Sequence, residues 1–435
     1  MRIASLARWV ALVIFIFGLG VTYGTVNHTG TKGLIASVQR SFDVLRNKTA
    51  TGNWFPARFE RFGVLRHDRA RGQPGYVLYT LAADLSAHLI DMDGRELHRW
   101  SLSRDDVMPQ AASRVRTFFG LLKSQIDEAY LFPNGDILLL YTQPAMGDWG
   151  GPLVKLDKNS RILWKTEVKA HHGLQVTSDR IYLLTETFEP PSETPIVPSL
   201  AGMPYIDDKV SVLDADGKEL SSHSILRAIA NTKQMRLAEE VPFNDRADPL
   251  HANSLQVLDE QTARFIPGAK PGNVLLSLKH LDMLVVMDLE SETIVWALRG
   301  SWRAQHDAKI LPNGNILLFD NQGGLTTHGK SRVLEIVPAT GGIVWSFEGK
   351  NDDPLDSPIR GGEQRMANGH TLVNESTSGR ILEVAPDGSV VWEYVHPLQE
   401  VEHGRKLVAA LGRGVTRYDP SYASFLDRQS YEAAR

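Results

Sequence analysis

The sequence predicts an all-β protein, a six-bladed β-propeller with an N-terminal transmembrane helix. Three observations carry this prediction: a unit of four short strands recurs along most of the chain, five of the six units contain a recurring tryptophan, and an apolar run precedes the first of them. Repeats of roughly 40 to 50 residues that each form a four-stranded sheet are typical of β-propellers.

The clearest unit extends from Gln305 to Trp345. Two of its apolar runs flank a turn in which Pro312 fixes φ at the first corner, while Asn313 and Gly314 supply the positive φ values of a tight hairpin. A second predicted hairpin follows and ends at Trp345. The unit therefore contains four antiparallel strands.

Five further segments repeat this order, the first of them in degenerate form. They comprise residues 75–100, 130–164, 174–218, 254–296 and 364–392. Large aromatic side chains dominate such cores, so the recurring tryptophans are interpreted as packing residues between neighbouring blades. These tryptophans are Trp100, Trp164, Trp296, Trp345 and Trp392.

The composition is that of a globular protein and excludes several classes of function. Hydrophobic residues make up 42% and charged residues 23% of the chain. The 47 basic and 51 acidic residues give a net charge of −4 without a basic run, which argues against nucleic acid as a partner. The absence of cysteine excludes disulfides, cysteine-based zinc sites and thiol nucleophiles.

The N-terminal sequence predicts a membrane anchor that is not cleaved after export. Arg2 and Arg8 precede the uncharged run Trp9–Gly24, which is close to the ~20 residues that span a bilayer. The positive-inside rule places the N-terminus in the cytoplasm and the propeller on the periplasmic side of the inner membrane, as a single-pass protein. A cleaved signal peptide is the alternative, but no Ala-x-Ala-like site follows the run, which favours the anchor.

We accordingly divide the chain into four parts. Residues 1–28 form the anchor or uncleaved signal, 29–72 a helical or irregular spacer, 73–420 the six-bladed propeller and 421–435 a C-terminal tail. Within the propeller, residues 222–243 contain a helix-like pattern that we interpret as an excursion between blades.

Polar side chains recur where the innermost strand of each blade begins, a position that lies at the mouth of a propeller's central channel. The four elements are His171-His172, His251 with Asn253, His306 with Asp307, and Glu363-Gln364. The second unit has Glu128 at the equivalent place, so the repeat does not need histidine for packing. We therefore predict that the histidines converge on one axis and are functional.

Two kinds of chemistry fit these histidines: a metal site with imidazole ligands, or nucleophilic and acid–base chemistry on an anionic group. Asn253 and Lys279 add hydrogen-bond donors, which suit sulfuryl or phosphoryl oxygens better than a carboxylate-rich cage does. The pattern favours the second interpretation, and we predict neither a metal nor a cofactor.

Four motifs together resemble the bacterial arylsulfate sulfotransferase (arylsulfotransferase) family. They are Ala170-His171-His172, His251-Ala252-Asn253-Ser254, the segment from Ser277 to Asp282, and His306-Asp307 followed by the 311–317 turn. The resemblance covers roughly residues 74 to 420 and rests on the order and spacing of the histidine elements as well as on the repeat.

The resemblance implies an exported six-bladed enzyme that moves a sulfuryl group from a phenolic sulfate ester to a phenolic acceptor, without a nucleotide sulfate donor. His306 would be transiently sulfurylated, and His251 and His172 would handle the phenol proton. The substrate-binding residues would be Asn253, Lys279, His171 and Asp307. Asp307 is interpreted either as a partner that orients His306 or as a hydrogen-bonding residue at the strand start.

The chain departs from the family pattern at two positions. The family commonly has arginine where this chain has Lys279, and an ammonium lacks the fork of a guanidinium. Gly173 follows the paired histidines where we expect aspartate or a bulkier polar residue.

Two other classes of protein are alternatives. A non-catalytic, membrane-anchored propeller that binds or scaffolds partner proteins in the periplasm would leave the three histidines without a purpose. The turn from Thr340 to Trp345 also resembles the tryptophan-docking turn of pyrroloquinoline quinone dehydrogenases, but those need eight blades.

Overall fold

The computed structural model describes residues 53–107, 125–142, 150–232, 236–239, 241, 248–321 and 331–426. The chain divides into Met1–Thr51 and Gly52–Arg435, and all of the description below concerns the second unit. The predicted membrane anchor, residues 1–28, lies outside the described residues. Within them, no helix is both long and apolar enough to cross a bilayer.

Two of the sheets each contain four consecutive antiparallel strands. The first comprises β13 (Ala252–Val257), β14 (Val274–Leu278), β15 (Met283–Asp288) and β16 (Thr293–Arg299). The second comprises β17 (His306–Ile310), β18 (Ile316–Asp320), β19 (Arg332–Ile336) and β20 (Ile343–Phe347). The predicted turn joins β17 to β18: Gly314 has a φ of 89° and its amide donates to the Leu311 carbonyl at 2.8 Å.

A seven-stranded sheet contains two of the predicted units. Its strands are β6 (Gln125–Leu131), β7 (Ile137–Thr142), β8 (Gly151–Leu156), β9 (Ile162–Val176), β10 (Ile181–Glu189), β11 (Tyr205–Leu213) and β12 (Glu219–Ser224). Within β9, Ala170 pairs both with Gly151 of β8 and with Thr185 of β10. The long strand β9 thus ends one unit and begins the next.

Strands from the two ends of the described region pair with each other. β29 (Thr416–Tyr418) is the edge strand of the sheet formed by β3 (Tyr76–Thr80), β4 (Ser86–Ile90) and β5 (Glu96–Ser101). Another sheet comprises β23 (Gly362–Arg365), β24 (Thr371–Glu375), β25 (Arg380–Val384) and β26 (Val390–Val395), with β2 (Gly63–His67) at its edge. Such pairing fixes the start of the domain to its end.

Part of the predicted spacer belongs to the β-structure. β2 pairs with β26, and β1 (Trp54–Pro56) pairs with β28 (Arg405–Ala409), which pairs with β27 (Gln399–Glu402). Residues 54–56 and 63–67 are therefore strands and not an irregular spacer. The sequence interpretation missed them because strands this short show little alternation of their own.

Short helices and one small ladder complete the described structure. They are α3 (Arg104–Val107), α5 (Ile225–Asn231), α6 (Glu260–Ala263), η2 (Pro198–Leu200), η4 (Leu237–Glu239), η5 (Lys279–Leu281), η6 (Ser376–Ser378) and the strands β21 (Gly349–Lys350) and β22 (Asp353–Pro354). The helix-like pattern in 222–243 is confirmed as α5, which begins after Ser224, whose side chain accepts from the Arg227 amide.

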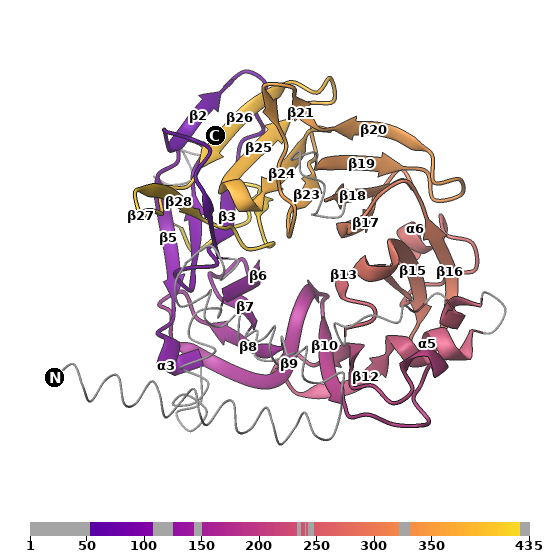
Figure 1. Cartoon of the computed structure of the whole chain (residues 1–435). Helices are drawn as coiled ribbons and strands as arrows, with labels where there is room; N and C mark the ends of the chain where they lie inside the picture. The colour runs from indigo at the N-terminus through magenta and orange to yellow at the C-terminus, as the bar shows by residue number, and fades with distance from the viewer. Residues whose placement is uncertain are drawn as a thin grey trace. The chain divides into compact units, whose positions relative to one another are not determined.

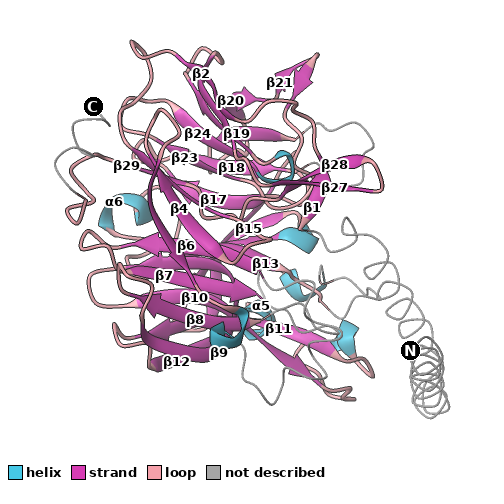
Figure 2. Ribbon diagram, turned by 90° about the vertical axis from the view of Figure 1, so that its left-hand side faces the viewer, coloured by secondary structure: helices cyan, strands magenta, loops and turns pink. Residues whose placement is uncertain are grey.

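The sheets succeed one another around a central region, and the strands β6, β9, β13, β17 and β23 lie nearest to it (Figure 1). The view turned by 90° shows strands throughout and only short helices (Figure 2). The predicted all-β class is confirmed, and the arrangement is propeller-like. The number of blades stays a prediction.

Hydrophobic clusters fill the spaces between neighbouring sheets. One cluster joins Leu284 and Val286 of β15 to Ile310 of β17 and Leu318 of β18. Three of the tryptophans also bond across a sheet boundary through their indole N–H groups. Trp100 donates to the Gly135 carbonyl, Trp345 to that of Pro386 and Trp392 to that of Met92. Their interpretation as packing residues between sheets is confirmed.

Candidate functional site

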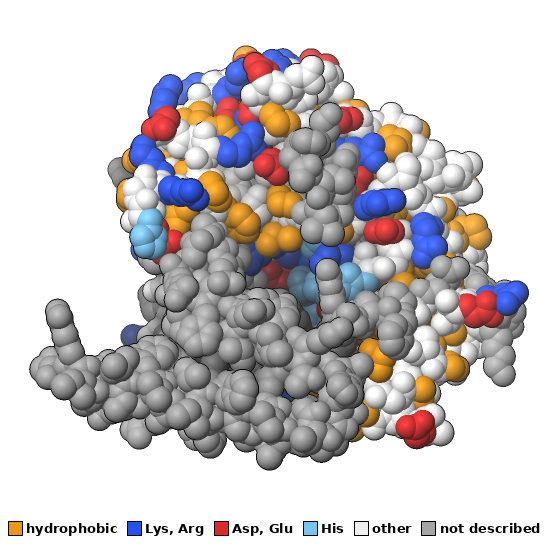
Figure 3. All heavy atoms as spheres, viewed as in Figure 1, with side chains coloured by type: hydrophobic (Ala, Val, Ile, Leu, Met, Phe, Trp, Pro, Cys, Tyr) orange, Lys and Arg blue, Asp and Glu red, His pale blue; other side chains and the backbone are white. Residues whose placement is uncertain are grey.

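The predicted histidines lie on or directly before three neighbouring inner strands, β9, β13 and β17. His172 is within β9, His251 directly precedes β13, and His306 is the first residue of β17. The rings of His172 and His251 are 5.2 Å apart between centroids. His, basic and acidic side chains gather in the hollow at the middle of this face (Figure 3). His171 and His280 extend the group, at 5.2 Å from His172 and 4.9 Å from His251.

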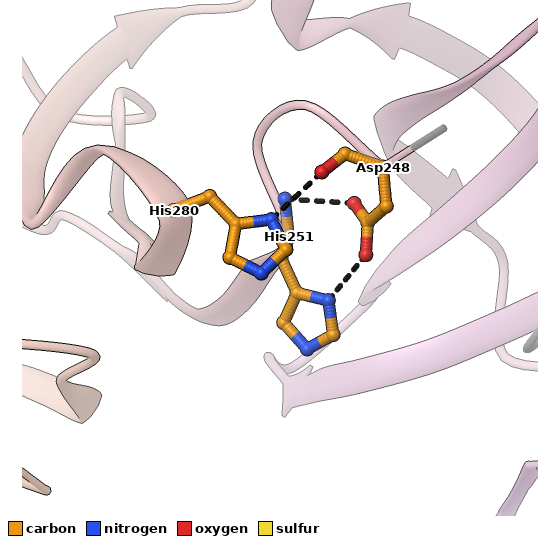
Figure 4. A group of neighbouring side chains, drawn as sticks. All are labelled: Asp248, His251 and His280. Carbon is orange, nitrogen blue, oxygen red and sulfur yellow. Dashed lines mark hydrogen bonds and ion pairs between the residues drawn. The ribbon is translucent and has the colours of Figure 1, made fainter. Parts of the chain in front are cut away.

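Asp248 orients two of these rings (Figure 4). The His251 amide donates to the Asp248 carboxylate at 3.0 Å, and His251 Nδ1 donates to its other oxygen. His280 Nδ1 donates to the Asp248 backbone carbonyl at 2.7 Å. Because Nδ1 of each ring faces an acceptor, Nε2 of each neutral ring has the lone pair. Sequence analysis missed Asp248, which precedes the motif it recognised.

The backbone of His251 is held in a conformation that non-glycine residues rarely adopt, with a φ of 49°. Such a conformation costs about 1–3 kcal/mol and persists where the surroundings determine it. The two hydrogen bonds to Asp248 hold the His251 backbone in this conformation. Although burial alone would raise the pKa of Asp248, the adjacent His251 holds it well below the usual range. Burial and the charge of His251 lower the pKa of His280 to about 4.

His171 lies behind His172 and is buried against two carboxylates. Its Nε2 is 3.3 Å from Asp208 Oδ1, and Glu186 is close to both. Burial by itself lowers the pKa of His171, but Asp208 and Glu186 outweigh burial and raise it to about 9. An imidazolium at His171 donates from Nδ1 to His172 Nδ1, 2.9 Å away. The hydrogen of neutral His172 is then on Nε2, which is 3.8 Å from Asp127 Oδ2.

His306 has a defined tautomer. Its Nδ1 lies 2.7 Å from Asn321 Oδ1 and 2.9 Å from the Ala304 carbonyl. Asn321 Nδ2 donates to the carbonyls of Ser357 and Arg360, which fixes the amide so that its oxygen faces His306. His306 Nδ1 must therefore be protonated, and Nε2 has the lone pair.

His306 is also held neutral. Its side chain is 3% exposed, and burial lowers its pKa well below the usual value. The positive charges of Arg413 and Lys279 lower it further. Burial and the charge of Arg413 likewise lower the pKa of His172. A neutral imidazole with a defined lone pair is a nucleophile or a general base.

Two of the predicted substrate-binding residues, Asn253 and Lys279, are in different surroundings. Asn253 Nδ2 donates to the Gln305 carbonyl at 2.7 Å, while Asn253 Oδ1 is buried without a hydrogen-bond partner in the described part of the chain. Asn253 thus offers an acceptor as well as one remaining N–H. Lys279 begins η5, and its charge acts on both His306 and His280.

Asp307 accepts from Lys309 Nζ at 2.9 Å and from the Glu363 amide at 3.0 Å. The bond from Glu363 ties β17 to β23, whereas the side chain that orients His306 is Asn321. The interpretation of Asp307 as a hydrogen-bonding residue at the strand start agrees with these contacts better than a role in orienting His306 does.

Sequence analysis gave Glu128 no role in the site and missed Arg413. Glu128 Oε1 accepts from Arg413 Nη2 at 2.9 Å and from the Gly173 amide at 3.1 Å, and its other oxygen accepts from the Leu174 amide. Gly173 has a φ of 67°, which favours glycine and accounts for this departure from the family pattern. Glu128 occupies the strand-start position of the histidines, and that position was the only signal for it.

Two groups of side chains have the spacing of cation ligands. In Asp248, His251 and His280, and in His171, Glu186 and Asp208, one ligand atom of each residue lies within 4.8 Å of the others. In the first group a hydrogen bond joins His251 to Asp248, and in the second an ion pair joins His171 to Asp208.

Comparisons with known proteins were made for the whole chain. A search of the curated proteins found no match. Two solved structures are weakly similar: a protein of unknown function from Bacteroides caccae (13% identity, TM-score 0.43, covering 74% of this chain and 94% of that one) and a streptogramin B lyase (11%, 0.41, 84% and 97%). The quinohemoprotein alcohol dehydrogenase of Comamonas testosteroni is similar at 12% identity and a TM-score of 0.40, covering 87% of this chain and 81% of that one.

The family comparison is the informative one. The model of the arylsulfotransferase (ASST) family matches residues 128–396, which is more than half of the chain and includes every predicted site residue. The match begins at Glu128 and ends after β26, so it also contains the strand starts that carry the histidines. The chain belongs to the arylsulfotransferase family.

Proposed function

We propose that this protein transfers a sulfuryl group from an aryl sulfate to a phenolic acceptor in two steps, through a sulfohistidine at His306 on a six-bladed propeller. The observation that carries the proposal is the neutral His306 ring, whose lone pair is restricted to Nε2 by Asn321. The family supports sulfuryl transfer in general. The covalent intermediate and the roles below are our proposals.

In the first step, the lone pair of His306 Nε2 attacks sulfur. A nitrogen–sulfur bond forms as the ester sulfur–oxygen bond breaks, and the phenolate leaves with the bonding electrons. The two nitrogens of the sulfurylated imidazole ring share a positive charge, and the Asn321 and Ala304 oxygens stabilise its Nδ1–H group. In the second step, the oxygen of the acceptor phenol attacks sulfur and the nitrogen–sulfur bond breaks. Splitting the transfer in this way gives ping-pong kinetics.

The proton of the phenol passes through a histidine in both steps. We assign His251 to this role because Asp248 holds its Nδ1 and leaves Nε2 to exchange a proton. Protonated His251 Nε2 gives a proton to the leaving phenolate, and neutral His251 takes the proton of the acceptor. His172 is the second candidate, but its Nε2 already has the ring hydrogen near Asp127 and its lone pair faces His171, so it could give a proton at Nε2 and not take one there. General acid–base catalysis of this kind contributes about 10²–10⁴-fold.

The sulfuryl oxygens need fixed donors where negative charge develops. Lys279 supplies a positive charge that acts on His306, and Asn253 supplies one N–H. His171, which is buried behind His172, acts through that ring as a positive charge. Asp307 positions β17 against β23 through Lys309 and Glu363.

We further propose that residues 1–28 anchor the protein in the inner membrane with the propeller in the periplasm. The proposal rests on the apolar run Trp9–Gly24 behind two arginines. Retention of the full-length protein in carbonate-washed membranes, together with protease access only from the periplasmic side, tests it.

The proposed transfer is tested by mixing the full-length protein with 4-nitrophenyl sulfate, with and without phenol. We expect nitrophenolate release that continues only with phenol, and a transient sulfuryl adduct on His306 by mass spectrometry. A single burst without phenol should equal the enzyme concentration. Neither release nor adduct with several aryl sulfates would contradict the proposal and favour a binding propeller.

The pH dependence of the first step should follow the lowered pKa of His306. Because folding lowers this pKa, the ring stays neutral as the pH falls below the ordinary value of about 6.5. With 4-nitrophenyl sulfate, whose leaving group needs no proton, the burst rate should stay flat from about pH 8 to below pH 6. The unfolded chain binds the proton that folded His306 does not, so the contribution of this ring to stability falls as the pH drops below about 6.5.

Stopped-flow bursts measured from pH 5 to 8 on samples checked for native circular dichroism give the profile. A burst rate that falls with a single-proton midpoint near the ordinary histidine pKa, in folded protein, would mean that the nucleophile is not the ring described here.

A further inference from the structure

We propose that the guanidinium of Arg413 binds the sulfate oxygens of the donor and of the sulfurylated intermediate. Arg413 would thus supply the forked hydrogen-bond donor that Lys279 lacks. The inference rests on the proposed function and deepens it. Arg413 lies outside the strands and outside the family match, between β28 and β29.

The backbone of Arg413 is held tightly in place. Its amide donates to the Asp127 carbonyl at 2.7 Å, and the Gly412 amide donates to the Thr80 carbonyl at 2.9 Å. A Cβ on Gly412 would lie 1.9 Å from Thr80 Oγ1, and one on Gly414 would lie 2.7 Å from the Ala129 amide nitrogen. Glycine on both sides allows this close approach, and the position of the arginine is thereby fixed before any ligand binds.

The guanidinium of Arg413 is buried and only partly paired. The residue is 4% exposed, and Nη2 donates to Glu128 Oε1 at 2.9 Å. Nε and Nη1 are buried without a hydrogen-bond partner in the described part of the chain. Unpaired N–H groups of a buried cation are costly, and oxygens of an anion would satisfy them. A planar guanidinium is the side chain best suited to several oxygens of one tetrahedral anion.

Three contacts place Arg413 between the histidine elements. Glu128 Oε1 joins it to the Gly173 amide, directly after His172. The Asp127 residue whose carbonyl binds the Arg413 amide also lies 3.8 Å from His172 Nε2 through its carboxylate.

The third observation concerns Gly362, the first residue of β23, which lies near both Asp307 and the Arg413 backbone. A Cβ on Gly362 would lie 2.7 Å from Asp307 Oδ2 and 3.5 Å from the Arg413 carbonyl, which places Arg413 beside the residue that follows His306. In keeping with this position, the charge of Arg413 lowers the pKa of both His172 and His306.

Of the acidic neighbours of Arg413, Glu128 pairs with Nη2 and leaves Nε and Nη1 without a partner in the described part of the chain. Burial raises the pKa of Glu128 despite the opposing effect of Arg413. Burial and the charge of Asp307 raise the pKa of Glu363 well above its usual value. Both carboxyls are thus shifted toward their neutral forms, and Asp127 is the remaining acid beside His172. A buried guanidinium whose Nε and Nη1 have no partner in the described part of the chain favours an anion as its ligand.

Binding, and not turnover, tests this inference. Arg413→Lys and Arg413→Gln are made in full-length His306→Ala protein, which cannot form the intermediate, and 4-nitrophenyl sulfate is titrated by calorimetry. Hydrogen bonds from a charged donor predict a loss of affinity on the order of tenfold or more for both variants. Affinity for 4-nitrophenol, which has no sulfate, should be unchanged.

Arg417→Lys is the matched control. Arg417 is also buried with two unpaired nitrogens, but it pairs with Glu383 and lies over the Trp392 ring, and it should leave donor affinity unchanged. The lysine variant of Arg413 keeps the charge opposite Glu128, so it guards against a glutamine variant that fails to fold. Undiminished binding of 4-nitrophenyl sulfate by folded Arg413→Lys and Arg413→Gln would overturn the inference.

The outcomes for the two proposals are separable. If the His306→Ala protein binds 4-nitrophenyl sulfate through Arg413 while the parent protein forms no adduct, the anion site stands and the proposed transfer fails. If the parent transfers the sulfuryl group and the Arg413 variants bind the donor normally, the transfer stands and the anion site fails.

Discussion

His306→Ala is expected to abolish sulfuryl transfer, with a loss of at least about 10³-fold in kcat. The variant removes the only atom to which we assign the nucleophilic attack, Nε2 of a ring kept neutral by burial and by the charges of Arg413 and Lys279. The measurement is release of nitrophenolate with phenol present, together with the intact mass, which should show no adduct.

The same substitution should lower stability only moderately. It leaves Asn321 Oδ1 without its partner, and such a buried acceptor costs about 1–3 kcal/mol. His396→Ala provides the matched control because His396 is equally buried and bonds the Ala409 carbonyl, which is not part of the proposed site. The control should lose stability and keep activity.

Chemical rescue makes the test of His306 specific. In His306→Gly, added imidazole should accept the sulfuryl group from 4-nitrophenyl sulfate in the vacated position and restore nitrophenolate release. A His306→Ala protein that still transfers sulfuryl groups at a rate near that of the parent would rule out His306 as the nucleophile.

Asp248→Asn is expected to have the second largest effect, a loss of about 10²–10⁴-fold with acceptors and donors that depend on proton transfer. The carboxylate holds both the amide and Nδ1 of His251, and it stabilises the imidazolium that forms when Nε2 takes a proton. Asparagine fills the same space but lacks the charge. His251 would therefore lose basicity and orientation while the fold remains.

The dependence on the leaving group separates catalysis from structure. Donors with poorly acidic phenols need protonation and should lose most, while 4-nitrophenyl sulfate should lose least. Asp207→Asn is the control, since Asp207 is also buried and bonds Ser224 on the outer strands. Equal losses for all donors, accompanied by a collapsed melting temperature, would instead make Asp248 a structural residue.

Local chemistry determined much of the fold and part of the site in advance. The 312–314 turn needs Pro, Asn and Gly whatever surrounds it, and the strands on either side of it formed as predicted. The tryptophans were predictable because a large aromatic at the end of each hairpin must be buried against a neighbour. The phase of the repeat also predicted that His172 and His251 would meet, and their rings do.

Other features arise only when distant segments are brought together. Arg413 meets Glu128 across 285 residues, and no periodicity relates their positions. Asn321 follows β18 and could be read as an ordinary strand end, yet its amide determines the tautomer of His306 because two distant carbonyls fix its direction. The strands at 54–56 and 63–67 exist because partners near the other end of the chain complete their hydrogen bonds.

For this protein, the sequence by itself determined the all-β class, the repeat, the family and the set of histidines, because each depends on residue types at short spacing. The tertiary structure alone decided which nitrogen of His251 and of His306 has the lone pair, which side chain orients each ring and which buried cation lowers the pKa of His306. Those properties depend on burial and on hydrogen bonds between residues far apart in the chain, so the spacing of residues along the sequence does not predict them.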